Sequence, residues 1–386
     1  MKNFFLVFLF CHVFAFGSRE FSDFDKFQGR WTRADMEERL GLFLQKDGRV
    51  ASYFSLSDDA LVIYNAPETQ KNREAEYELK LAPTKNESGS YEKKQKSLVG
   101  VKIAIDPGHL GGPYARLEER FIDIPPSLER PEPIQFDEGT LSFLTAVYLK
   151  ILLEREGAIV MMTRDQVGKG VYGEDFFDWL KKNPDLWKGE ISLNKLFRRF
   201  YNPLDLRARA AKINAFEPDL SIVIHYNSHE VEEEYSSNHC VASSNYNLVF
   251  IPGAFCRNEL VEYENRYEFL RLLASEDLPR SMQLSSEILR EFNHQLDVPV
   301  VSKIDGAHYL DKVCIKVEDG IYARNLALTR LIHSPVCYGE TLIQNNINEC
   351  INLNRRDFVI DGRPCSSRIK QVAEAYFAGI KNYILL

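Results

Sequence analysis

The fold of this chain is decided by one stretch of its sequence, VGVKIAIDPGHLGG at residues 99–112. Its first seven residues are mostly apolar, and the valines and isoleucines among them are typical of a strand buried inside a sheet. The proline and glycine that follow end the strand in a turn, so the sequence predicts that the imidazole of His109 lies at the strand end. A histidine there is well placed to bind a metal ion, but taken alone it is more often an ordinary loop residue.

Strand-like and helix-like segments alternate after this stretch. We expect a helix over residues 141–154, a strand over 158–162, a helix over 206–216, a strand over 220–224 and a closing amphipathic helix over 367–385. Such alternation is typical of an α/β fold with a mostly parallel sheet flanked by helices, in which ligands bind at the carboxyl ends of the strands.

The chain ahead of this domain divides into three predicted parts. Residues 1–17 combine a lysine, a short apolar run and small residues near Gly17, which predicts a secretory signal peptide and an exported, periplasmic or secreted protein without a transmembrane span after signal removal. Residues 18–84 resemble a small α+β module, a candidate for targeting, and residues 85–98 a polar linker. The module has one helix-like and three strand-like runs, at 33–45, 50–54, 60–64 and 77–81.

The remaining residues, 99–386, form the predicted main domain. Three long polar stretches interrupt it, and we interpret them as insertions near 113–137, 166–203 and 229–280. An acidic run, VEEEY at 231–235, stands in the third. Two interpretations of this insertion remain open, a lid that an activator protein removes and a solvated charge run.

Charge and cysteine content limit the class of partner and the kind of site. The net charge of −8 and the lack of a lysine or arginine stripe argue against nucleic acid as a partner. Outside the predicted signal peptide the cysteines form an even set, in a compartment where disulfides can form, and none of them makes the C-x-x-C pair of a thiolate zinc ribbon. They are Cys240, Cys256, Cys314, Cys337, Cys350 and Cys365.

Three further residues stand where chemistry can gather. Glu138 opens a helix, a position that the helix dipole favours for an acid even without a catalytic role. His225 ends an apolar strand, and so does Glu340, which is either a solvated glutamate or a group that accepts a proton from water. Two histidines and one carboxylate, here His109, His225 and Glu138, leave the fourth position of a zinc ion open for water.

These four signals, with their flanking residues, resemble in order and spacing the zinc-dependent N-acetylmuramoyl-L-alanine amidases, the family that includes bacterial cell-separation and sporulation amidases. The resemblance covers residues 99–386. It is carried by DPGHLGG at 106–112, Glu138, GAIVMMTR at 157–164, Leu206 with Arg209 and Asn214, PDLSIVIHYN at 218–227, SPVCYGE at 334–340 and the closing helix at 369–383. Leu110 departs from the family's D-P-G-H-G-G motif, which has a glycine in its place.

The resemblance implies a function and a site. It implies that His109, Glu138 and His225 bind zinc and that Glu340 is the general base. The substrate would be peptidoglycan or its soluble muropeptides, and a zinc-activated water would hydrolyse the amide bond between N-acetylmuramic acid and L-alanine. No organic cofactor is implied.

Several alternatives stay open beside this reading. Glu318 also ends an apolar strand and competes with Glu340 for the role of base. His229 lies four residues after His225, but that spacing aligns two imidazoles only on a helix. Cys337 is a conceivable nucleophile without a histidine placed near it by any pattern. A zinc peptidase acting on stem peptides and a catalytically degenerate cell-wall-binding protein are the alternative functions.

Overall fold

The computed structural model describes all residues except 1–18, 45–47, 85–96, 188–189, 230–241 and 257–258. The predicted signal peptide, the acidic run and most of the predicted linker therefore lie outside the described residues. Among the helices that are described, none is long and apolar enough to cross a membrane.

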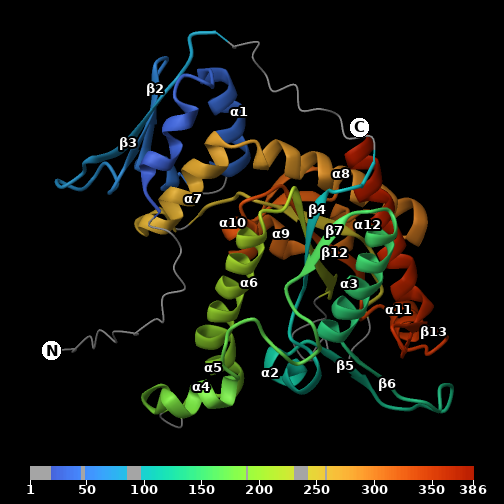
Figure 1. Ribbon diagram of the computed structural model, residues 1–386. Coiled ribbons are helices and arrows are strands. Elements are labelled where there is room, and N and C mark those ends of the chain that lie inside the picture. The colour runs from blue at the N-terminus through green and yellow to red at the C-terminus, as the bar shows by residue number, and fades with distance from the viewer. Residues whose placement is uncertain (1–18, 45–47, 85–96, 188–189, 230–241, 257–258) are drawn as a thin grey trace.

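A seven-stranded sheet forms the centre of the molecule, in the order β10-β11-β9-β12-β8-β4-β7 (Figure 1). Its strands are β4 (Lys102–Pro107), β7 (Ile159–Met162), β8 (Leu220–Asn227), β9 (Leu248–Ile251), β10 (Ile315–Glu318), β11 (Ile321–Ala323) and β12 (Val336–Ile343). The four strands β12, β8, β4 and β7 are parallel, whereas β9 runs antiparallel to β12 and β10 antiparallel to β11. The prediction of a mostly parallel sheet flanked by helices is confirmed.

Helices cover both faces of this sheet because its strands are apolar on both sides. Ile103 and Ile105 of β4 pack in one core with three long helices, and Ala104 between them packs in a second core with two helices on the opposite face. The first set is α3 (Glu138–Arg155), α8 (Asp277–Leu296) and α12 (Ser367–Leu385), and the second is α6 (Asn202–Phe216) and α10 (Ala327–Leu331). The closing amphipathic helix is thus confirmed.

Residues 19–84 form a small module of one helix, a three-stranded antiparallel sheet and 3-10 turns. Its elements are η1 (Phe21–Phe27), α1 (Arg33–Leu44), η2 (Val50–Tyr53), β1 (Phe54–Leu56), β2 (Ala60–Tyr64) and β3 (Ala75–Lys80). The predicted strand at 50–54 is wrong for most of its length, since Val50 and Tyr53 are both buried, three residues apart, as on one side of a 3-10 turn.

The module packs tightly on α7 (Tyr263–Ala274), and its apolar side chains join the main core. The Trp31 indole donates a hydrogen bond to the Ala274 carbonyl at 2.8 Å, and Arg266 of α7 pairs with Glu76 at 2.6 Å. Figure 1 places the module at the end of the molecule opposite α2 (Ala115–Glu118), which follows β4. The module and the main domain therefore form one body.

The three stretches interpreted as insertions differ in what they contribute. The stretch 113–137 holds most of η3 (Gly112–Tyr114), α2, β5 (Phe121–Ile124) and β6 (Ile134–Asp137), and 166–203 forms its own aromatic cluster. That cluster is built on α4 (Phe176–Lys182), η4 (Pro184–Leu186), α5 (Leu193–Leu196) and the π-helical turn η5 (Phe197–Tyr201).

The described part of the third stretch, 229–280, contains a strand of the central sheet. β9 pairs with both β11 and β12. η6 (Glu259–Val261) leads into α7, the helix against which the N-terminal module packs. The sequence did not reveal β9 because its four apolar residues are flanked by polar ones on one side and a Pro-Gly pair on the other. The acidic run at 231–235, on which the lid hypothesis rests, lies outside the described residues.

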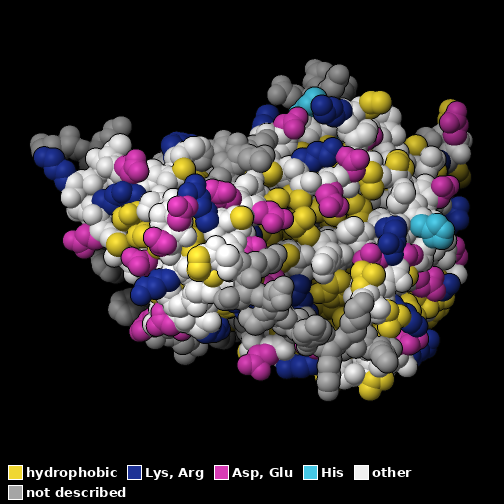
Figure 2. Space-filling model, turned by 90° about the horizontal axis from the view of Figure 1, so that it is seen from above, with side chains coloured by type: hydrophobic (Ala, Val, Ile, Leu, Met, Phe, Trp, Pro, Cys, Tyr) yellow, Lys and Arg dark blue, Asp and Glu magenta, His cyan; other side chains and the backbone are white. Residues whose placement is uncertain are grey.

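Five short elements remain to be named. They are η7 (Lys303–Asp305), α9 (His308–Val313), α11 (Ile347–Leu353), β13 (Phe358–Ile360) and β14 (Arg363–Cys365). Figure 2 shows basic and acidic side chains interspersed over the face seen from above, so the described part of this face presents both signs of charge.

Candidate metal centre

The turn after β4 brings His109 against His225 of the neighbouring strand β8. His109 adopts a left-handed backbone, with φ 54°, and its ring meets that of His225 edge to face at a centroid distance of 4.8 Å. A Cβ on Gly108 would lie 2.3 Å from the His225 ring, so the turn can lie this close only because residue 108 is glycine.

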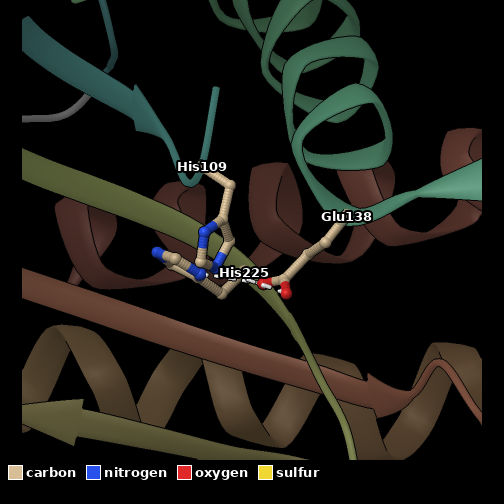
Figure 3. Close-up of side chains that lie close together, drawn as sticks. All are labelled: His109, Glu138 and His225. Atoms are coloured by element: carbon tan, nitrogen blue, oxygen red, sulfur yellow. Dashed lines mark hydrogen bonds and ion pairs between the residues drawn. The ribbon is translucent and has the colours of Figure 1, made fainter. Parts of the chain in front are cut away.

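Glu138 joins the two histidines from the first turn of α3. Its Oε1 lies 2.9 Å from His225 Nδ1 and its Oε2 lies 3.3 Å from His109 Nε2. The three potential ligand atoms all lie within 4.8 Å of one another, and Figure 3 shows the side chains pointing toward one another from three different elements. The cluster that the sequence predicted is therefore assembled, and its donor set can hold a metal ion.

Each imidazole is also held from its other nitrogen. Glu118 Oε1 lies 3.4 Å from His109 Nδ1, and the hydroxyl of Tyr338 lies 2.8 Å from His225 Nε2. Such partners fix which nitrogen faces the centre of the cluster and how each ring is oriented. The nitrogens that face Glu138 are Nε2 of His109 and Nδ1 of His225.

The charges of the cluster favour a bound cation. Burial would raise the pKa of Glu138, but the two histidines hold it well below its ordinary value. Burial would likewise raise the pKa of Glu118, yet His109 and two backbone amides lower it. Burial lowers the pKa of His109, but the two carboxylates outweigh it and raise the value to about 9. Two ionised carboxylates thus share one small space with the imidazoles.

Glu118 was not anticipated from the sequence. It lies in the stretch 113–137, where no spacing distinguishes it from the neighbouring acids, and in the fold it accepts hydrogen bonds from the backbone amides of Leu110 at 2.9 Å and Gly111 at 3.0 Å. It therefore holds both the turn after β4 that carries His109, here called the metal-site turn, and the His109 ring itself.

Buried arginines hold the same turn from behind. Arg164 donates to the carbonyls of Pro107 at 2.8 Å and Leu110 at 3.1 Å, and Arg209 donates to the Pro107 carbonyl at 3.2 Å. Arg209 is itself anchored by Asp205 at 2.7 Å. Arg164 of the GAIVMMTR stretch and Arg209 thus hold the turn, and neither is among the residues that line the cavity.

Leu110, the departure from the D-P-G-H-G-G motif, has a structural reason. Its side chain is fully buried in the aromatic cluster of 166–203, against which the turn packs. Leu110 and the stretch 166–203 therefore belong to one packing unit beside the turn.

Glu340 lies in the same cavity as the three potential ligands. The cavity measures about 430 Å³ and is lined by His109, Arg120, Glu138, His225, Tyr226, Asn227, Ser228, His229, Tyr309, Arg324, Leu326, Tyr338 and Glu340. Burial and the charge of Glu138 raise the pKa of Glu340 to about 8, while Arg324 opposes the shift. A carboxyl group with this pKa is suited to proton transfer near neutral pH.

Two of the predicted strand-end positions need correction. β8 continues past His225 to Asn227, and β12 continues past Glu340 to Ile343, so both residues lie inside their strands. They reach the same place nevertheless, because Glu340 and His225 are paired in register across β12 and β8.

The competing residues occupy other positions. Glu318 is exposed on β10 and is not among the described residues that line the cavity. His229 lines the cavity outside the three-residue cluster, with Nδ1 3.1 Å from the hydroxyl of Tyr246. Burial raises the pKa of the Cys337 thiol to about 12, which keeps it protonated and unsuited to nucleophilic attack.

Most of the chain matches a known protein family. Residues 103–382 match the sequence profile of a family described as N-acetylmuramoyl-L-alanine amidase. Among solved structures, the chain is similar to the CwlD amidase of Clostridioides difficile in complex with the GerS lipoprotein, with 18% identity over 74% of this chain and 98% of that one and a TM-score of 0.40. It is also similar to Ami1 of Mycobacterium smegmatis, with 12% identity over 75% and 98% of the two chains and a TM-score of 0.43. A search of curated proteins gives no match.

Proposed function

The chain belongs to the N-acetylmuramoyl-L-alanine amidase family, and from this membership we propose that it hydrolyses the amide bond between N-acetylmuramic acid and L-alanine in peptidoglycan with the help of bound zinc. The observation that carries the proposal is the cluster of His109, Glu138 and His225, whose ligand atoms lie within 4.8 Å of one another. Glu340 lines the same cavity.

The residues present fit a zinc ion. Two imidazoles and a carboxylate form a donor set that hydrolytic zinc sites use, with a fourth position kept for water. Glu118 and Tyr338 hold the outer nitrogens of the two rings, as partners of metal-binding histidines commonly do. Zinc bound by these residues would supply a water of lowered pKa and a Lewis acid for the substrate carbonyl.

Glu340 performs the proton transfers in this proposal. Its carboxylate accepts a proton from the attacking water and returns it to the nitrogen of L-alanine as the amide bond breaks. Its raised pKa, caused by burial and by Glu138, makes the carboxylate a stronger base than an exposed glutamate.

The substitution Glu340→Gln tests this role. We expect the variant to keep stoichiometric zinc in metal analysis and to lose about 100- to 10,000-fold in hydrolysis rate, the usual contribution of general acid-base catalysis. Glu318→Gln is the matched control, because Glu318 is exposed on β10 and away from the cavity. A Glu340→Gln enzyme with bound zinc and full rate would refute the assignment.

The masses of the products separate the candidate activities. An amidase releases intact stem peptide and muramic acid without a peptide, whereas a zinc peptidase cuts inside the stem peptide. A purified protein that holds no zinc and releases neither product would instead be a cell-wall-binding protein. Muropeptides and intact sacculi should both be offered as substrates, because both contain the amide bond.

The proposed substrate lies outside the cytoplasmic membrane. We therefore propose that the protein is exported to the periplasm or beyond, with residues 1–17 as its signal peptide. The mature protein should then begin at Ser18, which N-terminal sequencing can check. An uncleaved, membrane-retained chain would contradict the proposal of removal.

A further inference from the structure

Arg324 occupies a distinct position in the wall of the cavity. It directly follows β11, and its backbone amide donates to the Ile251 carbonyl of β9 at 3.0 Å, which fixes the start of its side chain. Its guanidinium lies 4.9 Å from the ring centroid of Phe250 and 5.6 Å from that of Tyr309. These cation–π contacts with the two aromatic rings hold the guanidinium in place, and they leave its hydrogen-bond donors unused.

The guanidinium of Arg324 has no acceptor of its own in the described part of the protein. None of the hydrogen bonds or ion pairs among the described residues involves its side chain, and the side chain is only half-buried. Arg120, the other arginine of the cavity, differs in this respect. Its Nε lies 3.6 Å from Glu138, and its terminal nitrogen donates to the Glu119 carbonyl at 3.2 Å. As far as the described residues go, the donors of Arg324 are therefore available to a ligand in the cavity.

The position of Arg324 relative to the reacting atoms is constrained by Glu340. Both residues line the same cavity of about 430 Å³, and the positive charge of Arg324 acts on the Glu340 carboxyl. A ligand group that contacts Arg324 therefore lies near the bond on which Glu340 acts. A planar guanidinium with free donors recognises a carboxylate through two parallel hydrogen bonds.

We infer that Arg324 binds a free carboxylate of the stem peptide close to the scissile amide and makes the enzyme selective for acidic over amidated peptides. This inference rests on the proposed amidase function. Near the scissile bond the glycan and the lactyl amide are uncharged, whereas the residue after L-alanine can carry a carboxylate. Charge-assisted hydrogen bonds of this kind change affinity by about 10- to 100-fold.

A second role for Arg324 makes a different prediction. If its charge only tunes Glu340, then removing it impairs hydrolysis of every substrate to the same extent. If it also binds the substrate, the loss is larger for peptides that carry the carboxylate. A suitable pair of substrates is N-acetylmuramoyl-L-alanyl-D-glutamate and the corresponding isoglutamine compound, each with its γ-carboxyl blocked as the methylamide, so that they differ only at the α-carboxyl group.

The experiment compares kcat/KM for these two compounds in the zinc-loaded enzyme and in Arg324→Gln. We expect the wild type to prefer the acid about 10- to 100-fold, and the variant to keep its zinc but to lose this preference, because its rate on the acid should fall about 10- to 100-fold further than its rate on the amide. Arg363→Gln is the matched control, because Arg363 is an exposed arginine 5.2 Å from the Phe143 ring and outside the cavity. Equal losses on both compounds, or a wild type without preference, would overturn the inference.

Binding provides a readout that does not depend on turnover. Calorimetric titration of zinc-loaded Glu340→Gln with each compound should show tighter binding of the acid, and Arg324→Gln in the same background should abolish the difference. If neither compound is hydrolysed by the wild type, the proposed function fails, yet the binding difference still supports or overturns the role of Arg324. Arg324→Lys serves where the glutamine variant does not fold, and it should retain only part of the preference because a lysine cannot form the paired contact.

Discussion

The close approach of the metal-site turn to His225 gives a direct test of the geometry, Gly108→Ala. The added Cβ would lie 2.3 Å from the imidazole, whereas ordinary contacts begin at 3.4 Å, so the ring must retreat by about 1.1 Å. The ring cannot retreat freely, because its nitrogens lie 2.9 Å from Glu138 and 2.8 Å from the Tyr338 hydroxyl. At least one of these contacts must lengthen beyond hydrogen-bonding range.

The consequence should appear in metal binding and in catalysis. Loss of a partner that orients a metal ligand typically weakens affinity by about 10- to 100-fold, and a displacement of about 1 Å in a catalytic site costs about 100-fold in rate. The fold should survive, since overpacking in a well-packed site costs about 1–3 kcal/mol. Zinc affinity by chelator competition, kcat/KM on muropeptides and the melting temperature together measure these effects.

A matched control exists for the same chemical change. A Cβ on Gly173 meets nothing within 4 Å, so Gly173→Ala should leave zinc affinity and activity unchanged. If Gly108→Ala also bound zinc with unchanged affinity and kept its full rate, the reasoning from the turn and the His225 ring would be wrong.

Three further predictions follow from buried contacts. Glu118→Gln removes the charge beside His109, 3.4 Å away, and should lower zinc affinity about 10-fold or more in chelator competition. Tyr338→Phe keeps the ring but removes the hydroxyl, so it should weaken zinc binding about 10-fold with little change in melting temperature, and an unchanged affinity would remove Tyr338 from the site. Glu268→Gln breaks a buried ion pair with Arg271 and should cost about 3 kcal/mol in urea unfolding at pH 7. Burial raises the pKa of Glu268 but Arg271 and neighbouring cations lower it to about 2, so its contribution should be complete above about pH 4.5 and disappear as the pH falls toward 2.

The candidate site could be predicted from the sequence because adjacent parallel strands end at the same edge of a sheet. β4, β8 and β12 are adjacent and parallel, so residues at or near their carboxyl ends must meet. That rule is enough to bring His109, His225 and Glu340 together, and α3 begins where Glu138 can join them. The roles of these residues remain predictions, but their convergence is a feature of the fold.

The residues that the sequence did not reveal act through contacts without a characteristic spacing. Glu118 reaches the site from a four-residue helix in a polar stretch, and its neighbours include other acids. Tyr338 had a usable signal, since it precedes Glu340 by two residues and successive alternate residues of a strand share a face. The guanidinium of Arg324 has no acceptor among the described residues, and no sequence pattern can report such a feature.

The relation of the N-terminal module to the main domain shows a second limit of sequence patterns. A polar linker predicts that two segments are joined flexibly, but it carries no information about whether they pack against each other. In the fold, Arg39 donates to the carbonyls of Leu273 at 2.7 Å and Ser275 at 2.6 Å, and Trp31 donates to that of Ala274. These carbonyls lie at the end of α7, where a helix lacks donors of its own and its dipole favours a cation. The module therefore caps a helix of the main domain and shares its core, so any targeting role must be performed by a surface of this joint body.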